Sequence, residues 1–118
     1  MGKAAITLYG IASCDSVRKA RKWLAERGVE YRFHDFRKDG LAEQQLQGWV
    51  AELGWEALLN RRGTTWRKLP EAVRDGIDEQ TAVRVMLEQP AIIKRPLLDL
   101  GSERRLGFSP ASYEELFA

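Results

Sequence analysis

The pattern of hydrophobic and polar residues divides the first third of this 118-residue chain into three elements. The β-branched and aromatic residues of 6–9 predict a strand that ends at Gly10. Apolar residues recur at helical spacing over 15–27, and Gly28 is placed to end that helix. Residues 29–35 alternate between apolar and polar, which predicts a second strand with one buried face. Two strands joined by a helix form a βαβ unit, so we expect them to be parallel.

The rest of the chain has a helical part followed by a second extended part. Apolar residues keep helical spacing through a block at about 41–89. Residues 92–100 and 104–108 then predict a hairpin, and Ser109 with Pro110 matches the N-cap and first position of a last helix. The predicted order is strand, helix, strand, helical insertion, strand, strand, helix.

Composition indicates one soluble domain. Hydrophobic residues make up 44% and charged residues 31%, which is the balance of a globular protein. No apolar run approaches the roughly 20 residues of a membrane-spanning helix, and no signal peptide is recognisable. We therefore expect a cytoplasmic protein with no membrane association. The net charge of +2 is too small to indicate nucleic acid as a partner.

Cys14, the only cysteine, lies between the first predicted strand and helix. Free N–H groups at a helix start favour a thiolate, the reactive form of the side chain. The alternative is a small buried apolar residue. A single cysteine excludes an intramolecular disulfide, so Cys14 can pair only with another molecule. His34 is the only histidine, which excludes a site with several histidine ligands, and we predict no metal site.

Three basic positions are candidates for an anion site. Arg18 follows Cys14 by four residues, on the same side of the predicted helix, where its charge would lower the thiol pKa further. Arg62 lies among arginine, glycine and hydroxyl residues that suit a carboxylate or oxyanion. For both arginines the alternative is an ordinary solvated charge. Arg95 precedes Pro96 where a strand begins; a cis peptide bond would explain that proline, and a trans proline at a sheet edge is the alternative.

Three separated motifs, 8–20, 57–69 and 92–98, resemble the arsenate-reductase-like (ArsC/Spx) family, and within it the YffB-like branch. The resemblance covers essentially the whole chain. It implies an α/β, thioredoxin-like fold with a mixed four-stranded sheet and an all-helical insertion. On this basis 1–118 is a single domain, with its core at about 1–40 and 90–118 and its insertion at about 41–89.

The resemblance also implies roles for individual residues. Cys14 matches the active cysteine, Arg18 the arginine four positions later, and Arg95 the arginine before the family's cis-proline, Pro96. Arg62 lies in the segment where relatives carry another anion-facing arginine.

From these assignments we expect a glutathione-dependent thiol oxidoreductase, with glutathione as co-substrate and no tightly bound cofactor. The alternatives are an arsenate or other oxyanion reductase, and a non-enzymatic regulator that binds a protein partner such as RNA polymerase. Arsenate reductases of the family carry a histidine where this chain has Gly10 and an arginine near 106–108, so we predict weak arsenate reduction. Regulators often carry a second cysteine where this chain has Val17, which excludes that redox switch.

Overall fold

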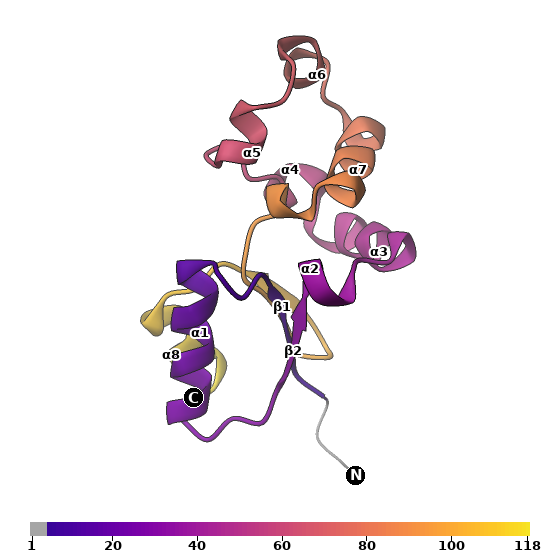
Figure 1. Ribbon diagram of the computed structural model, residues 1–118. Helices are drawn as coiled ribbons and strands as arrows, with labels where there is room; N and C mark the ends of the chain where they lie inside the picture. The colour runs from indigo at the N-terminus through magenta and orange to yellow at the C-terminus, as the bar shows by residue number, and fades with distance from the viewer. Residues whose placement is uncertain (1–4) are drawn as a thin grey trace. The chain divides into compact units, whose positions relative to one another are not determined.

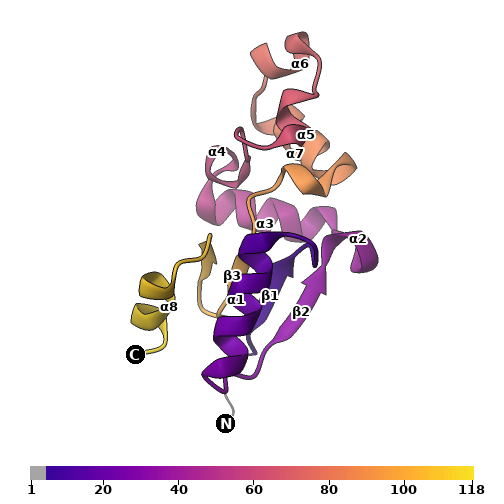
Figure 2. The same cartoon turned by 60° about the vertical axis from the view of Figure 1, so that its left-hand side comes forward.

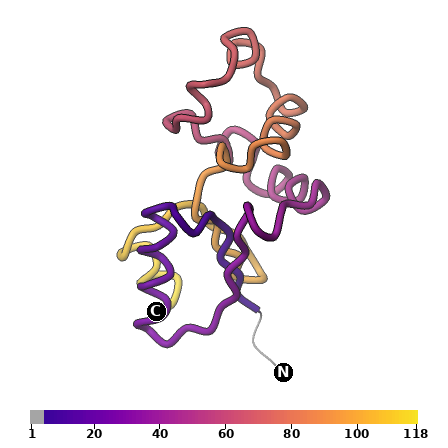
Figure 3. The backbone as a smooth tube through the Cα atoms, viewed as in Figure 1, coloured from indigo at the N-terminus to yellow at the C-terminus, as the bar shows by residue number. Residues whose placement is uncertain are grey.

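The computed structural model describes residues 5–118, which form two compact units. The first unit comprises residues 5–39 and Arg95–Ala118, and the second comprises Gly40–Lys94 (Figures 1 and 3). The chain leaves the first unit after Asp39 and returns to it at Arg95. The first unit contains a four-stranded sheet, whereas the second consists mainly of short helices.

The sheet of the first unit is mixed, with the strand order β2-β1-β3-β4. Strand β1 (Thr7–Gly10) pairs in parallel with β2 (Arg32–Asp35). On its other side β1 pairs antiparallel with β3 (Leu97–Asp99), which pairs antiparallel with β4 (Arg104–Leu106). Figure 2 shows β3, β1 and β2 side by side. The strand after Pro96 is therefore inside the sheet, and β4 is at its edge.

Helix α1 (Asp15–Glu26) ends as its sequence predicts. Gly28 adopts a φ of 68°, which is the left-handed conformation that favours glycine. The N–H groups of Gly28 and Val29 donate to the carbonyls of Ala25 and Leu24, at 3.1 and 3.0 Å. These bonds satisfy carbonyl groups that the end of the helix leaves open.

Helix α8 (Pro110–Leu116) lies with α1 on one face of the sheet (Figures 1 and 2). Its start is a reciprocal cap, in which the Ser109 hydroxyl accepts from the Ser112 N–H at 3.1 Å and the Ser112 hydroxyl accepts from the Ser109 N–H at 3.3 Å. The buried core between the helices and the sheet consists of Leu8, Ala20, Trp23, Leu24, Leu98 and Tyr113. Trp23 and Tyr113 pack edge to face, with ring centroids 5.5 Å apart.

The predicted order of elements is confirmed, with two local differences. The second strand begins at Arg32 rather than at Val29, because the Val29 N–H donates to Leu24 at the end of α1. The Arg32 N–H donates to Ile6, the residue before β1. A single helical turn, α2 (Phe36–Asp39), follows β2 directly and was not predicted. Four residues are too few to show a helical period.

The second unit contains α3 (Glu43–Leu53), α4 (Trp55–Leu58), α5 (Thr64–Arg67), α6 (Glu71–Asp75), α7 (Glu79–Glu88) and the 3₁₀ turn η1 (Pro90–Ile92). The ends of this unit are tied together by backbone hydrogen bonds. The Asn60 N–H donates to Ile92, and the Lys94 N–H donates to Leu58, both at 2.8 Å. Leu58, Leu59, Ile92 and Ile93 are almost fully buried in this region.

Candidate active site

Cys14 is the N-cap residue of α1, in the loop that follows β1. The Cys14 N–H donates to the Ile11 carbonyl at 3.0 Å, and the Cys14 carbonyl accepts from the Arg18 N–H at 2.9 Å. The Ile11 side chain is buried, which anchors the start of the loop. The cysteine itself is half-buried and is not in a disulfide. This position leaves the sulfur accessible beside the first N–H groups of the helix.

The thiol pKa of Cys14 results from opposing effects. Burial raises this pKa, but hydrogen bonds from the Val17 N–H, the Arg95 guanidinium and the Ser16 N–H lower it, and the charge of Arg95 lowers it further. The net direction is below the ordinary value.

The Arg95 guanidinium is the charged group that lowers the thiol pKa of Cys14. Arg95 precedes Pro96, and the Arg95–Pro96 peptide bond is cis, which confirms the prediction for this bond. Pro96 is buried, and its carbonyl accepts from the Gly107 N–H at 2.9 Å. The fold thus brings together Cys14, Arg95 and Pro96, three of the residues selected from the sequence.

Arg18 occupies a different environment from the one expected. Its guanidinium pairs with the carboxylate of Asp15, which lowers the pKa of that carboxyl group. The Arg18 side chain is 61% exposed, and it is not among the largest influences on the thiol pKa of Cys14. From its spacing along the helix, we expected Arg18 to lower the thiol pKa of Cys14. In the structure this effect comes from Arg95, which is far from Cys14 in the sequence.

Asp35 is a residue of this region that the sequence analysis missed. It ends β2 opposite Gly10 of β1, and its side chain is only 5% exposed. One carboxylate oxygen accepts from the Ala12 N–H at 3.2 Å, and the other accepts from the Arg37 N–H at 2.8 Å. The signal in the sequence was an acidic residue at the end of a predicted strand.

Gly10 lies where β1 approaches α1 most closely. A Cβ atom at this position would stand 2.5 Å from Cγ2 of Val17, closer than two carbon atoms can approach. Residue 10 therefore has to be glycine unless Val17 moves. The histidine expected here in arsenate reductases of the family would meet the same obstruction.

Arg62 belongs to the second unit and is exposed. Its N–H donates to the Asn60 side chain at 3.1 Å, and its carbonyl accepts from the Arg67 guanidinium at 2.9 Å. These bonds shape the turn before α5. The neighbouring Arg61 places its guanidinium 5.9 and 5.5 Å from the ring centroids of Trp55 and Trp66. The role of Arg62 in anion binding stays a prediction.

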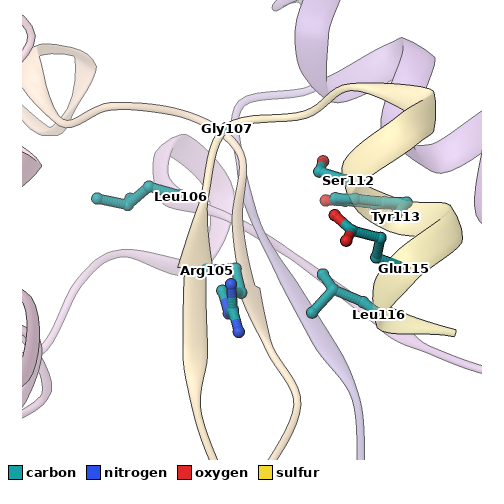
Figure 4. A pocket seen from close by; sticks show the side chains of 7 residues that line it. All are labelled: Arg105, Leu106, Gly107, Ser112, Tyr113, Glu115 and Leu116. Atoms are coloured by element: carbon teal, nitrogen blue, oxygen red, sulfur yellow. The ribbon is translucent and has the colours of Figure 1, made fainter.

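A separate pocket of about 280 Å³ lies between β4 and α8 (Figure 4). Its lining residues are Arg105, Leu106, Gly107, Ser112, Tyr113, Glu115 and Leu116. Arg105 pairs with Glu103, and burial raises the pKa of the Tyr113 hydroxyl. None of the site residues selected from the sequence lines this pocket.

Two structural features bear on other classes of function. Within residues 5–118, no three or more histidine, cysteine, aspartate or glutamate side chains are grouped so that they could hold a metal ion. None of the helices described here has the length and apolar character needed to cross a bilayer.

Comparisons with known proteins place this arrangement in a family. A solved structure of the YffB protein matches with a TM-score of 0.91 and 47% identity, over 97% of this chain and 100% of that chain. The solution structure of an arsenate reductase (ArsC) related protein from Brucella melitensis matches with a TM-score of 0.81 and 46% identity, over 99% of this chain and 98% of the other.

A more distant relative is the global transcriptional regulator Spx of Streptococcus agalactiae. It is 28% identical over 106 residues, which are 88% of this chain and 77% of the regulator. The model of the ArsC family matches residues 9–116, which include Cys14, Arg18, Arg62, Arg95 and Pro96. A match over nearly the whole length, together with a mixed four-stranded sheet and a helical insertion, shows that the chain belongs to the ArsC family.

Proposed function

We propose that this protein is a glutathione-dependent thiol oxidoreductase in which Cys14 is the nucleophile. The observation that carries the proposal is the position of Cys14 at the start of α1, where the N–H groups of the helix and the Arg95 guanidinium together lower its thiol pKa. A thiol with a lowered pKa is partly ionised near neutral pH, and only the thiolate attacks disulfides.

The proposed reaction consists of two thiol–disulfide exchanges. The Cys14 thiolate attacks one sulfur of a substrate disulfide, which forms a mixed disulfide with Cys14 and releases the other half of the substrate as a thiolate. A glutathione thiolate then attacks the substrate sulfur of the mixed disulfide. This step releases a substrate–glutathione disulfide and restores the Cys14 thiolate. A thiol of another molecule has to take the second step because the chain has no other cysteine, and in this proposal that thiol is glutathione.

Arg95 has a second role in the proposal, which is to bind a carboxylate of glutathione. Glutathione carries two carboxylates, and a guanidinium binds a carboxylate through paired hydrogen bonds. The extended backbone of the tripeptide would lie beside Pro96, in the manner of an added strand. Arg62, which belongs to the second unit, would also bind an anion, and the variant Arg62→Ala tests that role separately.

Calorimetry and mass spectrometry test this proposal together. We expect glutathione to bind the wild-type protein, and to bind Arg95→Ala at least tenfold more weakly, the loss of about 1.4 kcal/mol. Arg105→Ala is the matched control, because it removes an exposed guanidinium that pairs with Glu103. Oxidised glutathione should add one glutathione to the wild-type protein and none to Cys14→Ser. No binding and no adduct with the wild-type protein would refute the proposal.

A regulator is the second candidate, supported by the similarity to Spx. In that case the protein would bind a partner such as RNA polymerase, and the thiol chemistry of Cys14 would be dispensable. Co-purification with RNA polymerase that Cys14→Ser leaves unchanged, combined with no reaction with oxidised glutathione, would favour the regulator over the enzyme.

A further inference from the structure

Asp35 is an ionisable side chain buried in the first unit that the proposed reaction does not use. Among the residues described, it is the only polar or charged residue in the buried set. Burial raises the pKa of its carboxyl group, but hydrogen bonds from the N–H groups of Arg37, Ala12 and Lys38 lower it, and the net direction is down. Asp35 is therefore a carboxylate at neutral pH, stabilised by backbone donors rather than by water.

The bonds of this carboxylate connect two separate segments. Towards the adjacent turn α2, the Asp35 carboxylate accepts from the Arg37 N–H, and the Asp35 N–H donates to the Asp39 carboxylate at 3.0 Å. Towards β1, it accepts from the Ala12 N–H, 23 residues earlier in the chain. The bond to Arg37 shapes only the turn after β2, whereas the bond to Ala12 acts on the loop that carries Cys14.

Three interactions determine the path of this loop. The side chain of Ile11 is buried, the Cys14 N–H closes a turn onto the Ile11 carbonyl, and Ala12 is held by Asp35. The first two interactions fix Ile11 and Cys14 at the ends of the loop, and the hydrogen bond to Asp35 fixes Ala12 between them. Without it, the loop can rotate about the residues before Cys14 and move the sulfur away from the Val17 and Ser16 N–H groups.

We infer that Asp35 is a positioning residue for Cys14, which holds the loop at Ala12 so that the sulfur stays at the start of α1 beside Arg95. This inference rests on the proposed role of Cys14 as the nucleophile. Asp35 contacts neither the sulfur nor any reacting atom. Its effect on reactivity passes through the Ala12 N–H.

The charge and the position of Asp35 act on the thiol in opposite directions. As a negative charge, Asp35 disfavours a nearby thiolate, so its removal by charge alone would lower the thiol pKa of Cys14. As a positioning group, it keeps the thiolate beside its donors, so its removal would raise that pKa. The sign of the change therefore separates the two roles.

The test is the variant Asp35→Asn, with Asp39→Asn as its control. An asparagine has one acceptor oxygen and an NH₂ group that cannot accept, so at least one of the hydrogen bonds from the N–H groups of Ala12, Arg37 and Lys38 is lost. Hydrogen exchange of the Ala12 amide in the variant identifies the loss of its bond. The control removes a carboxylate charge from the same segment, and its amide oxygen can still accept from the Asp35 N–H as the Asp39 carboxylate does. The readout is the rate of Cys14 alkylation by iodoacetamide as a function of pH.

For Asp35→Asn we expect a higher thiol pKa and, at pH 7, alkylation about fivefold slower, the effect of losing one hydrogen bond. Asp39→Asn should alkylate within about twofold of the wild-type rate. A thiol pKa that is unchanged or lower in Asp35→Asn would overturn the inference. A wild-type thiol pKa at its ordinary value would instead refute the proposed nucleophile.

Hydrogen exchange of the wild-type protein keeps the inference testable if Asp35→Asn does not fold. The Ala12 amide should exchange more slowly than an unstructured amide of the same sequence, because its proton is held by the Asp35 carboxylate. Exchange at the unprotected rate would overturn the inference without any variant.

Discussion

Replacing Arg95 by alanine should raise the thiol pKa of Cys14. The substitution removes the guanidinium hydrogen bond to the sulfur and its positive charge together. Burial, which raises the pKa, remains, and the N–H groups of Val17 and Ser16 are left to oppose it alone. The thiolate of Arg95→Ala is therefore less favoured than that of the wild-type protein.

The size of this change follows from the strength of a hydrogen bond to a charged group, about 1.5–3 kcal/mol. Cys14 is half-buried, so water weakens the interaction, and the lower end of this range applies. Since one pH unit corresponds to about 1.4 kcal/mol, the thiol pKa should rise by about 1. At a pH below both pKa values, the thiolate fraction then falls about tenfold.

The assay is the rate of alkylation by iodoacetamide between pH 5 and 10, as proposed for Asp35. Arg95→Lys should lie between the wild-type protein and Arg95→Ala, because it keeps the charge but not the planar donor group. Arg18→Ala should change the midpoint little, because Arg18 is exposed and paired with Asp15. If Arg18→Ala raised the midpoint as much as Arg95→Ala, the assignment of Arg95 as the partner of the sulfur would be wrong.

Three further predictions concern stability and substrate choice. Ser109→Ala should lower the free energy of unfolding by about 1 kcal/mol in denaturant melts, through loss of the α8 cap, and an unchanged midpoint would contradict this. Gly10→Ala should cost about 1–3 kcal/mol by crowding Val17, and the added change Val17→Ala should recover part of this loss in the same melts. Arsenate, with glutathione and glutaredoxin supplied, should be reduced weakly or not at all in a coupled assay; rapid reduction that Cys14→Ser abolishes would show the reverse.

The parts of the fold that the sequence predicted are those with a visible period or a specific end signal. The helix over 15–27 has a regular apolar face and a glycine at its end, and the last helix has a serine and a proline at its start. The turn at Phe36–Asp39 has none of these features, and it was missed. The cis bond before Pro96 was predicted because a proline leading into an interior strand needs an explanation.

The site was harder to predict because its contacts are not local. Arg18 is one helical turn from Cys14, but Asp15 is equally near and carries the opposite charge. Arg95 reaches the sulfur only because β3 pairs with β1. Asp35 meets Ala12 because β1 and β2 end together, with Gly10 opposite Asp35. Strand register decides these contacts, and periodicity alone does not reveal register.

The edge of the sheet at β4 affects how the protein behaves at high concentration. An open edge can pair with the edge of another molecule and start aggregation. Strand β4 has only three residues, and two of them, Arg104 and Arg105, carry charged side chains. A short strand offers few backbone groups for pairing, and the exposed charge of Arg105 opposes the approach of a second edge. We therefore expect concentrated solutions to resist sheet-to-sheet association along β4.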